Sequence, residues 1–95
     1  MKIAFYSPHL SLGGTEITLY DFADYNEKLL GNESVIIYNE GNEANDDSVI
    51  KKFENRFQKI IPLQGPKENW CWISKTTVPL LDEALLREKC DAVYM

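Results

Sequence analysis

Short apolar runs alternate with stretches of helical periodicity along this chain. The runs are short enough for single strands, and they cover residues 2–6, 34–38, 59–63 and 91–95. Between them, apolar residues recur at helical spacing, which predicts helices over residues 15–30, from residue 47 or 48, and from residue 76 or 77. The pattern therefore predicts four strands joined by three helices, in the order β-α-β-α-β-α-β.

Each predicted helix carries an apolar stripe that we expect to face the core. The stripes are Leu19, Phe22, Ala23 and Leu30 in the first helix, Val49 or Ile50, Phe53 and Phe57 in the second, and Val78, Leu81 and Leu85 in the third. Gly31-Asn32 is expected to end the first helix. Asp47 or Ser48 is expected to cap the second helix, and Thr76 or Thr77 the third, with Pro79 in its first turn. Pro62 and the pair Gly65-Pro66 are expected to end the third strand.

The second predicted strand indicates how the strands pair. Val35, Ile36 and Ile37 follow one another without a polar residue, which favours a strand covered on both faces and hence a parallel sheet. Strands joined by helices form right-handed crossovers, and the simplest arrangement is a doubly wound, Rossmann-like α/β sheet. We expect the strand order 3-2-1-4.

The size and charge of the chain narrow its class. With 95 residues, 44% of them hydrophobic, it has enough apolar material for a single domain over residues 1–95, marginal in stability unless it docks onto a partner domain. Ten lysines and arginines stand scattered against 15 acidic residues, and the net charge of −5 argues against nucleic acid as a ligand.

Neither a membrane nor a metal is expected. No apolar stretch approaches the roughly 20 residues of a membrane span, and no secretion signal opens the chain. Cys71 and Cys90 lie far apart and lack metal-ligand spacing, so neither a disulfide nor a metal site has support. We expect a cytoplasmic protein with reduced thiols.

The candidate chemistry lies in the turn between the first strand and the first helix. Gly13 and Gly14 leave room for a ligand against the backbone, and the start of a helix presents unpaired N–H groups such as that of Thr15. This arrangement suits a phosphate. In a doubly wound sheet, ligands bind outside the carboxyl ends of the strands where the winding reverses, here between strands one and four. The glycine turn would form one lip of that crevice.

Residues 5–16 read Phe-x-x-Pro-His-Leu-Ser-x-Gly-Gly-Thr-Glu, and residues 30–35 read Leu-Gly-Asn-Glu-Ser-Val. This opening resembles that of glycosyltransferases with the two-Rossmann-domain GT-B fold, and is especially similar to the retaining family-4 type. The similarity of sequence covers about residues 2–39, and the order of elements extends it to residue 95. Gly-Gly alone is a weak motif, but Gly-Gly-Thr-Glu at this distance from an N-terminal strand is more specific.

The resemblance implies that this chain is the N-terminal, acceptor-side part of a hexosyltransferase. Such an enzyme moves a sugar from a nucleotide sugar to a carbohydrate or other hydroxyl acceptor, with retention and with no cofactor beyond its donor substrate. In that family the groups that hold the donor diphosphate belong to a second, C-terminal Rossmann domain, which is missing here. We therefore expect the isolated chain to be inactive.

Three interpretations of the glycine turn stay open. In the glycosyltransferase interpretation, Gly13, Gly14 and the N–H of Thr15 face the donor diphosphate or the acceptor in front of it. A dinucleotide site would need Gly-x-Gly-x-x-Gly, which is absent because no third glycine occurs before Gly31. Glu40 stands where a ribose-binding acid would, although its acid-rich loop favours a solvated side chain. The third interpretation is a tight turn with no ligand.

His9 and Glu16 flank the turn and are the other candidate site residues. Glu16 falls in the first helical turn, where its negative charge would interact favourably with the helix dipole. The alternative role is to accept a hydrogen bond from a hydroxyl of the sugar acceptor. His9 is a candidate catalytic base for deprotonating that hydroxyl. A retaining reaction needs no base there, so substrate binding is the favoured role of His9, and a loop histidine without a role stays open.

The aromatic residues divide into two groups. Tyr20, Phe22 and Tyr25 have helical spacing and are expected in the core more than at a ligand. Trp70 and Trp72 lie in an irregular stretch, where they would dock on the absent domain, pack locally or stack on a sugar. Cys71 between them has no adjacent base and is expected to be inert.

A second class of function is a noncatalytic α/β module that binds or assembles with a partner. The sequence shows no paired carboxylates, no Walker motif and no Ser/His/Asp arrangement that would point to another enzyme class. A natural stop soon after Met95 would favour the module, whereas a second Rossmann-like half downstream would favour the transferase.

Overall fold

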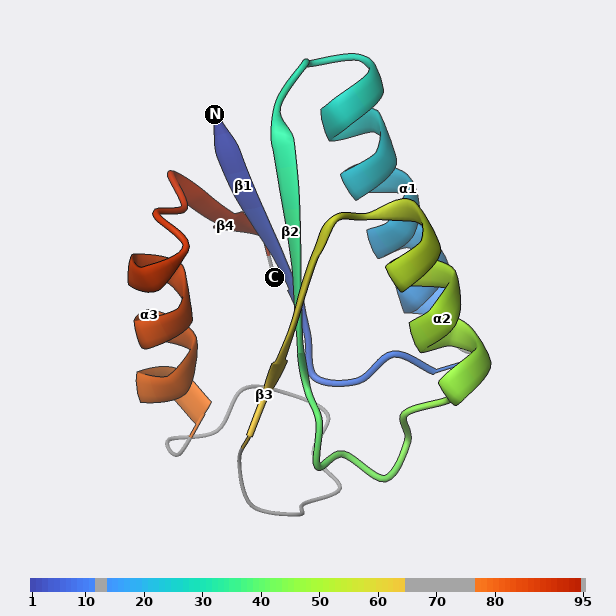
Figure 1. Cartoon of the computed structure of the whole chain (residues 1–95). Coiled ribbons are helices and arrows are strands. Elements are labelled where there is room, and N and C mark those ends of the chain that lie inside the picture. Colours follow the sequence, from blue (N-terminus) through green and yellow to red (C-terminus); the bar gives the residue numbers. More distant parts are fainter. Residues whose placement is uncertain (12–13, 65–76, 95) are drawn as a thin grey trace.

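The described part of the chain is a parallel sheet with helices on both faces (Figure 1). The structure is a computed structural model and describes residues 1–11, 14–64 and 77–94. The elements are β1 (Lys2–Ser7), α1 (Gly14–Lys28), β2 (Glu33–Asn39), α2 (Asp47–Arg56), β3 (Lys59–Leu63), α3 (Thr77–Arg87) and β4 (Ala92–Tyr94). The strand order is β3-β2-β1-β4 and every pair is parallel, which confirms the predicted Rossmann-like α/β fold.

The direction of winding decides which face each helix covers. The chain moves outward from β1 through β2 to β3 and then crosses back to β4 on the other side of β1. Because crossovers are right-handed, α1 and α2 lie on one face and α3 on the other. Figure 1 shows α1 and α2 to the right of the sheet and α3 to its left.

Each face of the sheet has its own core. On the α1–α2 face, Phe5, Ile36 and Tyr38 pack with Leu19 and Ala23 of α1 and with residues of α2. The α3 face holds smaller side chains, and its buried cluster is Ala4, Tyr6, Val35, Ile37, Leu63, Leu81 and Ala84. Consecutive residues of β2 alternate between the two clusters, because side chains of a strand point to opposite faces in turn. This explains the unbroken apolar run in β2.

The buried stripe of α1 differs from the predicted one. Leu19 and Ala23 are buried as expected, but Phe22 is 43% exposed and Leu30, beyond the end of the helix, is 71% exposed, so both predictions are wrong. Glu16 and Asn26 are buried in the same stripe instead. Hydrogen bonds accommodate the amide of Asn26, whose Nδ2 donates to Ser34 Oγ at 3.0 Å.

The stripe of α3 is also shorter than predicted. Leu81 and Ala84 are buried and Leu85 packs against them, whereas Val78 is exposed, so the prediction for Val78 is wrong. Leu80 also packs against this cluster, whereas Val78, near the start of the helix, is 42% exposed. Pro79 lies in the first turn of α3, as predicted, while Thr76 lies outside the described residues.

The end signals of the elements are partly as predicted. Gly31 has φ +69° after α1, the left-handed conformation expected there. The cap of α2 is Asp46, not Asp47 or Ser48, because the Asp46 carboxylate accepts from the N–H groups of Ser48 and Val49. Pro62 does not end β3 but lies within it, opposite Tyr38. A proline is tolerated there because β3 is an edge strand.

Candidate functional site

The β1–α1 connection reaches α1 at the carboxyl end of β1, as the sequence predicts. Gly14 and Thr15 are the first residues of α1. Gly13 lies outside the described residues, as do Trp70, Cys71 and Trp72. The described polar groups next to the turn are the side chains of His9, Ser11 and Glu16, and the structure brings these three together.

Glu16 is the buried member of this group. Its side chain is 3% exposed although it belongs to the first turn of a helix. Oε1 lies 3.0 Å from His9 Nδ1 and accepts from Ser11 Oγ at 3.4 Å. Oε2 is buried and has no hydrogen-bond partner among the described residues. An unpaired buried carboxylate oxygen is costly, and the cost is relieved by a ligand that donates a hydrogen bond.

His9 is held in place by its backbone neighbours. Ser7 Oγ donates to the His9 carbonyl at 2.6 Å. The next residue, Leu10, is fully buried, and its N–H donates to Asn45 Oδ1 at 2.9 Å while its carbonyl accepts from the Asp46 N–H at 2.8 Å. The loop before α2 therefore fixes the segment that carries His9.

The three side chains do not form a nucleophilic triad. Ser11 Oγ and Glu16 Oε1 both lie 3.0 Å from the same ring nitrogen of His9, Nδ1. A nitrogen this close to a carboxylate oxygen carries the proton and donates it. Activation of a serine needs the hydroxyl on one ring nitrogen and the acid on the other. The contact with His9 therefore orients the carboxylate of Glu16.

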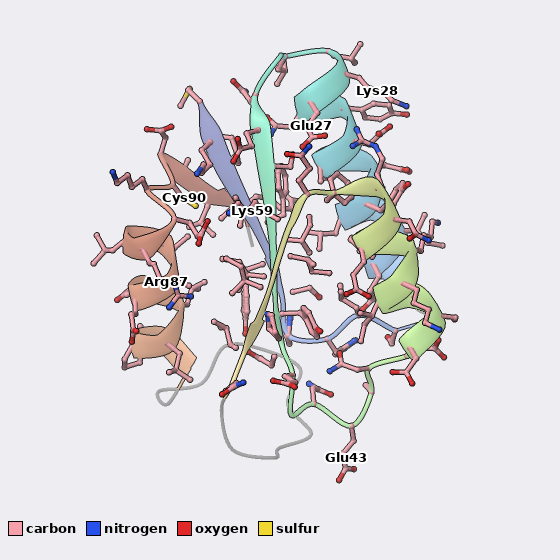
Figure 2. All side chains as sticks on the ribbon, in the orientation of Figure 1. Glu27, Lys28, Glu43, Lys59, Arg87 and Cys90 are labelled. Atoms are coloured by element: carbon pink, nitrogen blue, oxygen red, sulfur yellow. The ribbon has the colours of Figure 1, made fainter. Side chains whose placement is uncertain are left out.

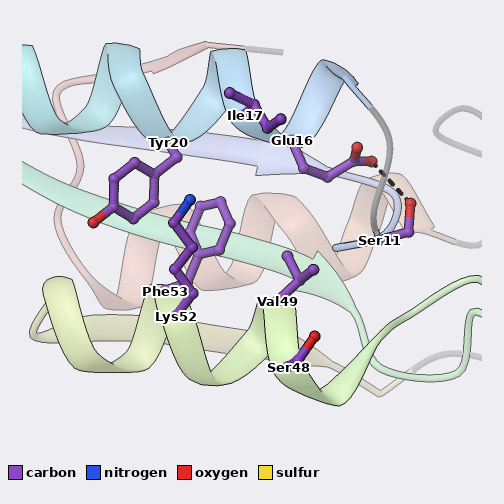
Figure 3. A pocket seen from close by; sticks show the side chains of 8 residues that line it. All are labelled: Ser11, Glu16, Ile17, Tyr20, Ser48, Val49, Lys52 and Phe53. Carbon is purple, nitrogen blue, oxygen red and sulfur yellow. Dashed lines mark hydrogen bonds between the residues drawn. The ribbon is translucent and has the colours of Figure 1, made fainter.

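A pocket opens beside this cluster, between α1 and α2 (Figure 3). Its volume is about 210 Å³, and it is lined by Ser11, Glu16, Ile17, Tyr20, Ser48, Val49, Lys52 and Phe53. Figure 3 shows Glu16 and Ser11 joined at one end of the pocket. The sequence did not predict this pocket, because residues of two different helices form it. The apolar residues near the starts of both helices were the only indication of it in the sequence.

The far end of the pocket is aromatic and basic. The Tyr20 ring meets the Phe53 ring edge to face, with centroids 5.3 Å apart. Lys52 Nζ lies 4.6 Å from the centre of the Tyr20 ring. Tyr20 thus belongs both to the core, as predicted, and to the wall of the pocket, and the ammonium group of Lys52 stands at the opposite end from Glu16.

An ion-pair cluster fastens the other ends of the same two helices. Arg56 of α2 donates from Nε to Asp24 and from Nη1 to Glu27 of α1, each at 2.7 Å. Burial raises the pKa of Asp24, but the hydrogen bond from Arg56 and the proximity of Lys28 outweigh it, and the net pKa is lowered. These ion pairs therefore link the C-terminal ends of α1 and α2.

A second buried oxygen without a partner among the described residues is Asn39 Oδ1, at the carboxyl end of β2. Asn39 Nδ2 donates to the Tyr6 hydroxyl at 2.8 Å. Burial raises the pKa of Tyr6, and this hydrogen bond offsets the rise only in part, so the phenol stays neutral. The carboxyl edge of the sheet thus carries polar groups on both faces.

The acidic loop after β2 faces solvent. Glu40 is exposed, as expected for a solvated acid, and Glu43 points away from the fold (Figure 2). Within the described residues, no His, Cys, Asp and Glu side chains gather into a metal-binding group. Burial raises the pKa of the Cys90 thiol, which is free, and keeps it protonated.

Across the described ranges, no helix combines the length and the apolar character needed to cross a membrane. No protein-family model, curated protein or solved structure matches this chain.

Proposed function

We propose that this chain is the acceptor-side, N-terminal part of a GT-B glycosyltransferase. The observation that carries the proposal is the buried carboxylate of Glu16, whose Oε2 has no partner among the described residues and lies beside the start of α1. The similarity of the Gly-Gly-Thr-Glu opening to the retaining family-4 type supports it.

The charge of Glu16 bears on which group lies next to it, the donor diphosphate or the acceptor hydroxyl. A phosphate offers only acceptor oxygens and negative charge, both of which a carboxylate opposes. A sugar hydroxyl donates a hydrogen bond, and a carboxylate oxygen accepts one. We therefore place the acceptor against Glu16, with the donor diphosphate held mainly by a second Rossmann domain. His9 binds and orients Glu16 instead of acting as a base.

The proposed reaction transfers a sugar from a nucleotide sugar to an acceptor hydroxyl in the cytoplasm. The bond between the anomeric carbon and the diphosphate breaks, a bond to the acceptor oxygen forms on the same face, and the acceptor's hydroxyl proton passes to the departing diphosphate oxygen. The backbone N–H groups of Gly14 and Thr15, at the start of α1, are the donors that we expect to face the bound substrates. Catalysis of this kind depends on positioning and on stabilising the leaving group, so few conspicuous residues are needed.

The first experiment sequences the open reading frame downstream of the codon for Met95. We expect a second Rossmann-like half with basic and glutamate residues, and sugar transfer by the whole product from UDP or GDP sugars but not by residues 1–95 alone. A stop codon directly after Met95, or transfer at enzyme-like rates by residues 1–95, contradicts the proposal.

A substitution in the turn then tests the role of the site. In the whole product, Gly14→Val should abolish transfer while the melting temperature stays close to that of the parent, because the added side chain obstructs the approach of a ligand to the helix start. Leu29→Val, on an exposed residue after α1, is the matched control and should leave transfer unchanged. Unchanged kinetics in Gly14→Val would make the turn a scaffold only.

One observation favours a noncatalytic binding module as the second candidate. The described residues that line the α1–α2 pocket lie between Ser11 and Phe53, so a pocket with polar, apolar and basic walls is present within these 95 residues. A stop codon after Met95 combined with ligand binding in this pocket would support the module over the transferase.

A further inference from the structure

A line of exposed, uncharged side chains runs along the flank of α1 that faces β4. Its members are Thr18, Phe22, Tyr25 and Leu29, which follow one another at intervals of four, three and four residues. Phe22 is 43% exposed, Tyr25 52% and Leu29 75%, and Thr18 is exposed as well. The ring contact between Phe22 and Tyr94 shows that this flank faces β4. We call these four residues the outer stripe of α1.

The outer stripe belongs to one continuous helix. α1 ends at Lys28, but the Leu29 N–H still donates to the Tyr25 carbonyl at 2.8 Å, which is the spacing of a helical hydrogen bond. A helix that covers a sheet buries one stripe and normally carries charges on its other sides. The outer stripe is instead a second uncharged surface, next to the stripe that α1 buries. The prediction that Tyr25 lies in the core is therefore wrong, as it is for Phe22.

The spacing of the outer stripe indicates what kind of element packs on it. Intervals of four and three residues average 3.5, which is the repeat along which two helices pack side by side. The side chains of a strand repeat every two residues and do not match this spacing. The element that fits the outer stripe is therefore another helix that runs along α1.

Two charges at the border of the outer stripe indicate which helix fits. Asp21 and Lys28 lie on the side of the stripe away from the sheet, seven residues apart, so they hold equivalent positions two turns apart. Both residues are exposed, and Lys28, which also pairs with Asp24 at 3.2 Å, points away from the sheet (Figure 2). An antiparallel copy of α1 brings Asp21 of each copy next to Lys28 of the other. A parallel copy places like charges together.

The same antiparallel arrangement pairs the side chains of the stripe. A two-fold axis between Phe22 and Tyr25 sets each Phe22 against Tyr25 of the other copy and each Thr18 against Leu29. Aromatic pairs of this kind stabilise a contact beyond the area that they bury. The dipoles of antiparallel helices also attract each other. The outer stripe is therefore complementary to itself, as an interface between identical copies requires.

We propose that the outer stripe of α1 is the contact through which two copies of this chain associate, with α1 packed antiparallel to α1 of the second copy. The contact consists of a few side chains from each copy, so the dimer is weak, with a dissociation constant on the order of 10–100 μM. The inference uses only α1 and its surroundings. It does not depend on the proposed function.

The first test is sedimentation equilibrium of the chain at concentrations from about 1 μM to about 500 μM. We expect the mass to rise from that of one chain to that of two and no further. Dilution of the ¹⁵N-labelled chain, followed by NMR, should shift the amide signals of residues 18–29 and leave those of β3 unchanged. A monomer at every concentration, larger assemblies, or shifts confined to the sheet edges would overturn the inference.

A charge placed in the outer stripe should break the dimer. Tyr25→Lys sets an ammonium group against Phe22 of the second copy, and it should weaken association at least tenfold, because that group loses water on association. Tyr25 is exposed, so circular dichroism should give the parent's melting temperature. Leu86→Lys, on a leucine of α3 that is 80% exposed, is the control and should associate like the parent. Equal association by both variants contradicts the proposal.

Charge reversal tests the antiparallel orientation. Asp21→Lys and Lys28→Asp should each weaken self-association about tenfold, because each turns two attractive pairs into two repulsive ones. An equimolar mixture of the two variants should associate about as tightly as the parent, since one copy then carries only positive and the other only negative charges at these positions. Single variants that associate like the parent, or a mixture that stays monomeric, would show that the two α1 helices do not pair in this way.

Discussion

Aromatic side chains lie on both flanks of α1, but those on one flank pack into the core and those on the other are exposed. Toward α2, Tyr20 packs against Phe53 and Phe57, which are 1% and 3% exposed. Toward β4, Phe22 meets Tyr94 with ring centroids 5.4 Å apart, and both residues are 43% exposed.

The difference lies in what covers each flank. The α2 helix closes the first, whereas none of the described residues closes the second, where β4 is the edge of the sheet. Aromatic residues at helical spacing therefore indicate contacts with other rings, but they do not indicate whether the rings are buried. The closed flank is also the one that holds the pocket and the ion pairs of Arg56.

The largest expected effect comes from breaking the closed flank. Phe53→Ala should lower the free energy of unfolding by about 3–5 kcal/mol, because it removes a buried ring and leaves a cavity. Urea denaturation followed by circular dichroism measures this change. Leu86→Ala, at a position 80% exposed on α3, is the control and should stay within about 0.5 kcal/mol of the parent. A small effect at Phe53 would show that the α1–α2 core is loosely packed.

A smaller effect is expected on the open flank. Phe22→Ala should cost about 1 kcal/mol, since the ring keeps much of its surface in water and contributes mainly its contact with Tyr94. A double-mutant cycle with Tyr94→Ala isolates that contact and should give a coupling of about 0.5–1.5 kcal/mol. A loss as large as that of Phe53→Ala would mean that the two flanks are equally closed.

The smallest effect is expected from the ion pairs, and it depends on pH. Arg56→Gln should destabilise the chain by less than Phe22→Ala at neutral pH, because partly exposed ion pairs contribute little. The pKa of Asp24 is lowered in the folded chain, so its contribution is fully present above the ordinary aspartate value of about 3.9 and is lost as the pH falls through the lowered value.

The difference in unfolding free energy between the parent and Arg56→Gln should accordingly stay constant from about pH 7 to pH 5 and shrink on further acidification. Urea melts at a series of pH values measure it, with Lys51→Gln, an exposed lysine on the same helix, as the control. A difference that persists unchanged at pH 2 would assign the effect of Arg56 to packing against the Phe57 ring, which lies 4.8 Å from the guanidinium carbon.

Most of the fold was predictable because it follows from local signals. The apolar run at Val35–Ile37 and the alternation of strands with helices led to the strand order that the structure has. Gly31 ends α1 in the expected conformation. Errors arose where a neighbour decides the outcome: Phe22 is exposed because no described element covers its flank, and Pro62 is tolerated within β3 because that strand pairs on one side only.

For the candidate site, the sequence by itself determined the place and the residue types: a glycine turn after the first strand, with His9 before it and Glu16 after it. Only the tertiary structure decided that Glu16 is buried on His9 and that Lys52 and Phe53 complete a pocket with it. Periodicity reports the spacing of residues along one element, whereas burial and charge pairing depend on distances between elements. The sheet sets those distances by placing α1 and α2 side by side on the same face.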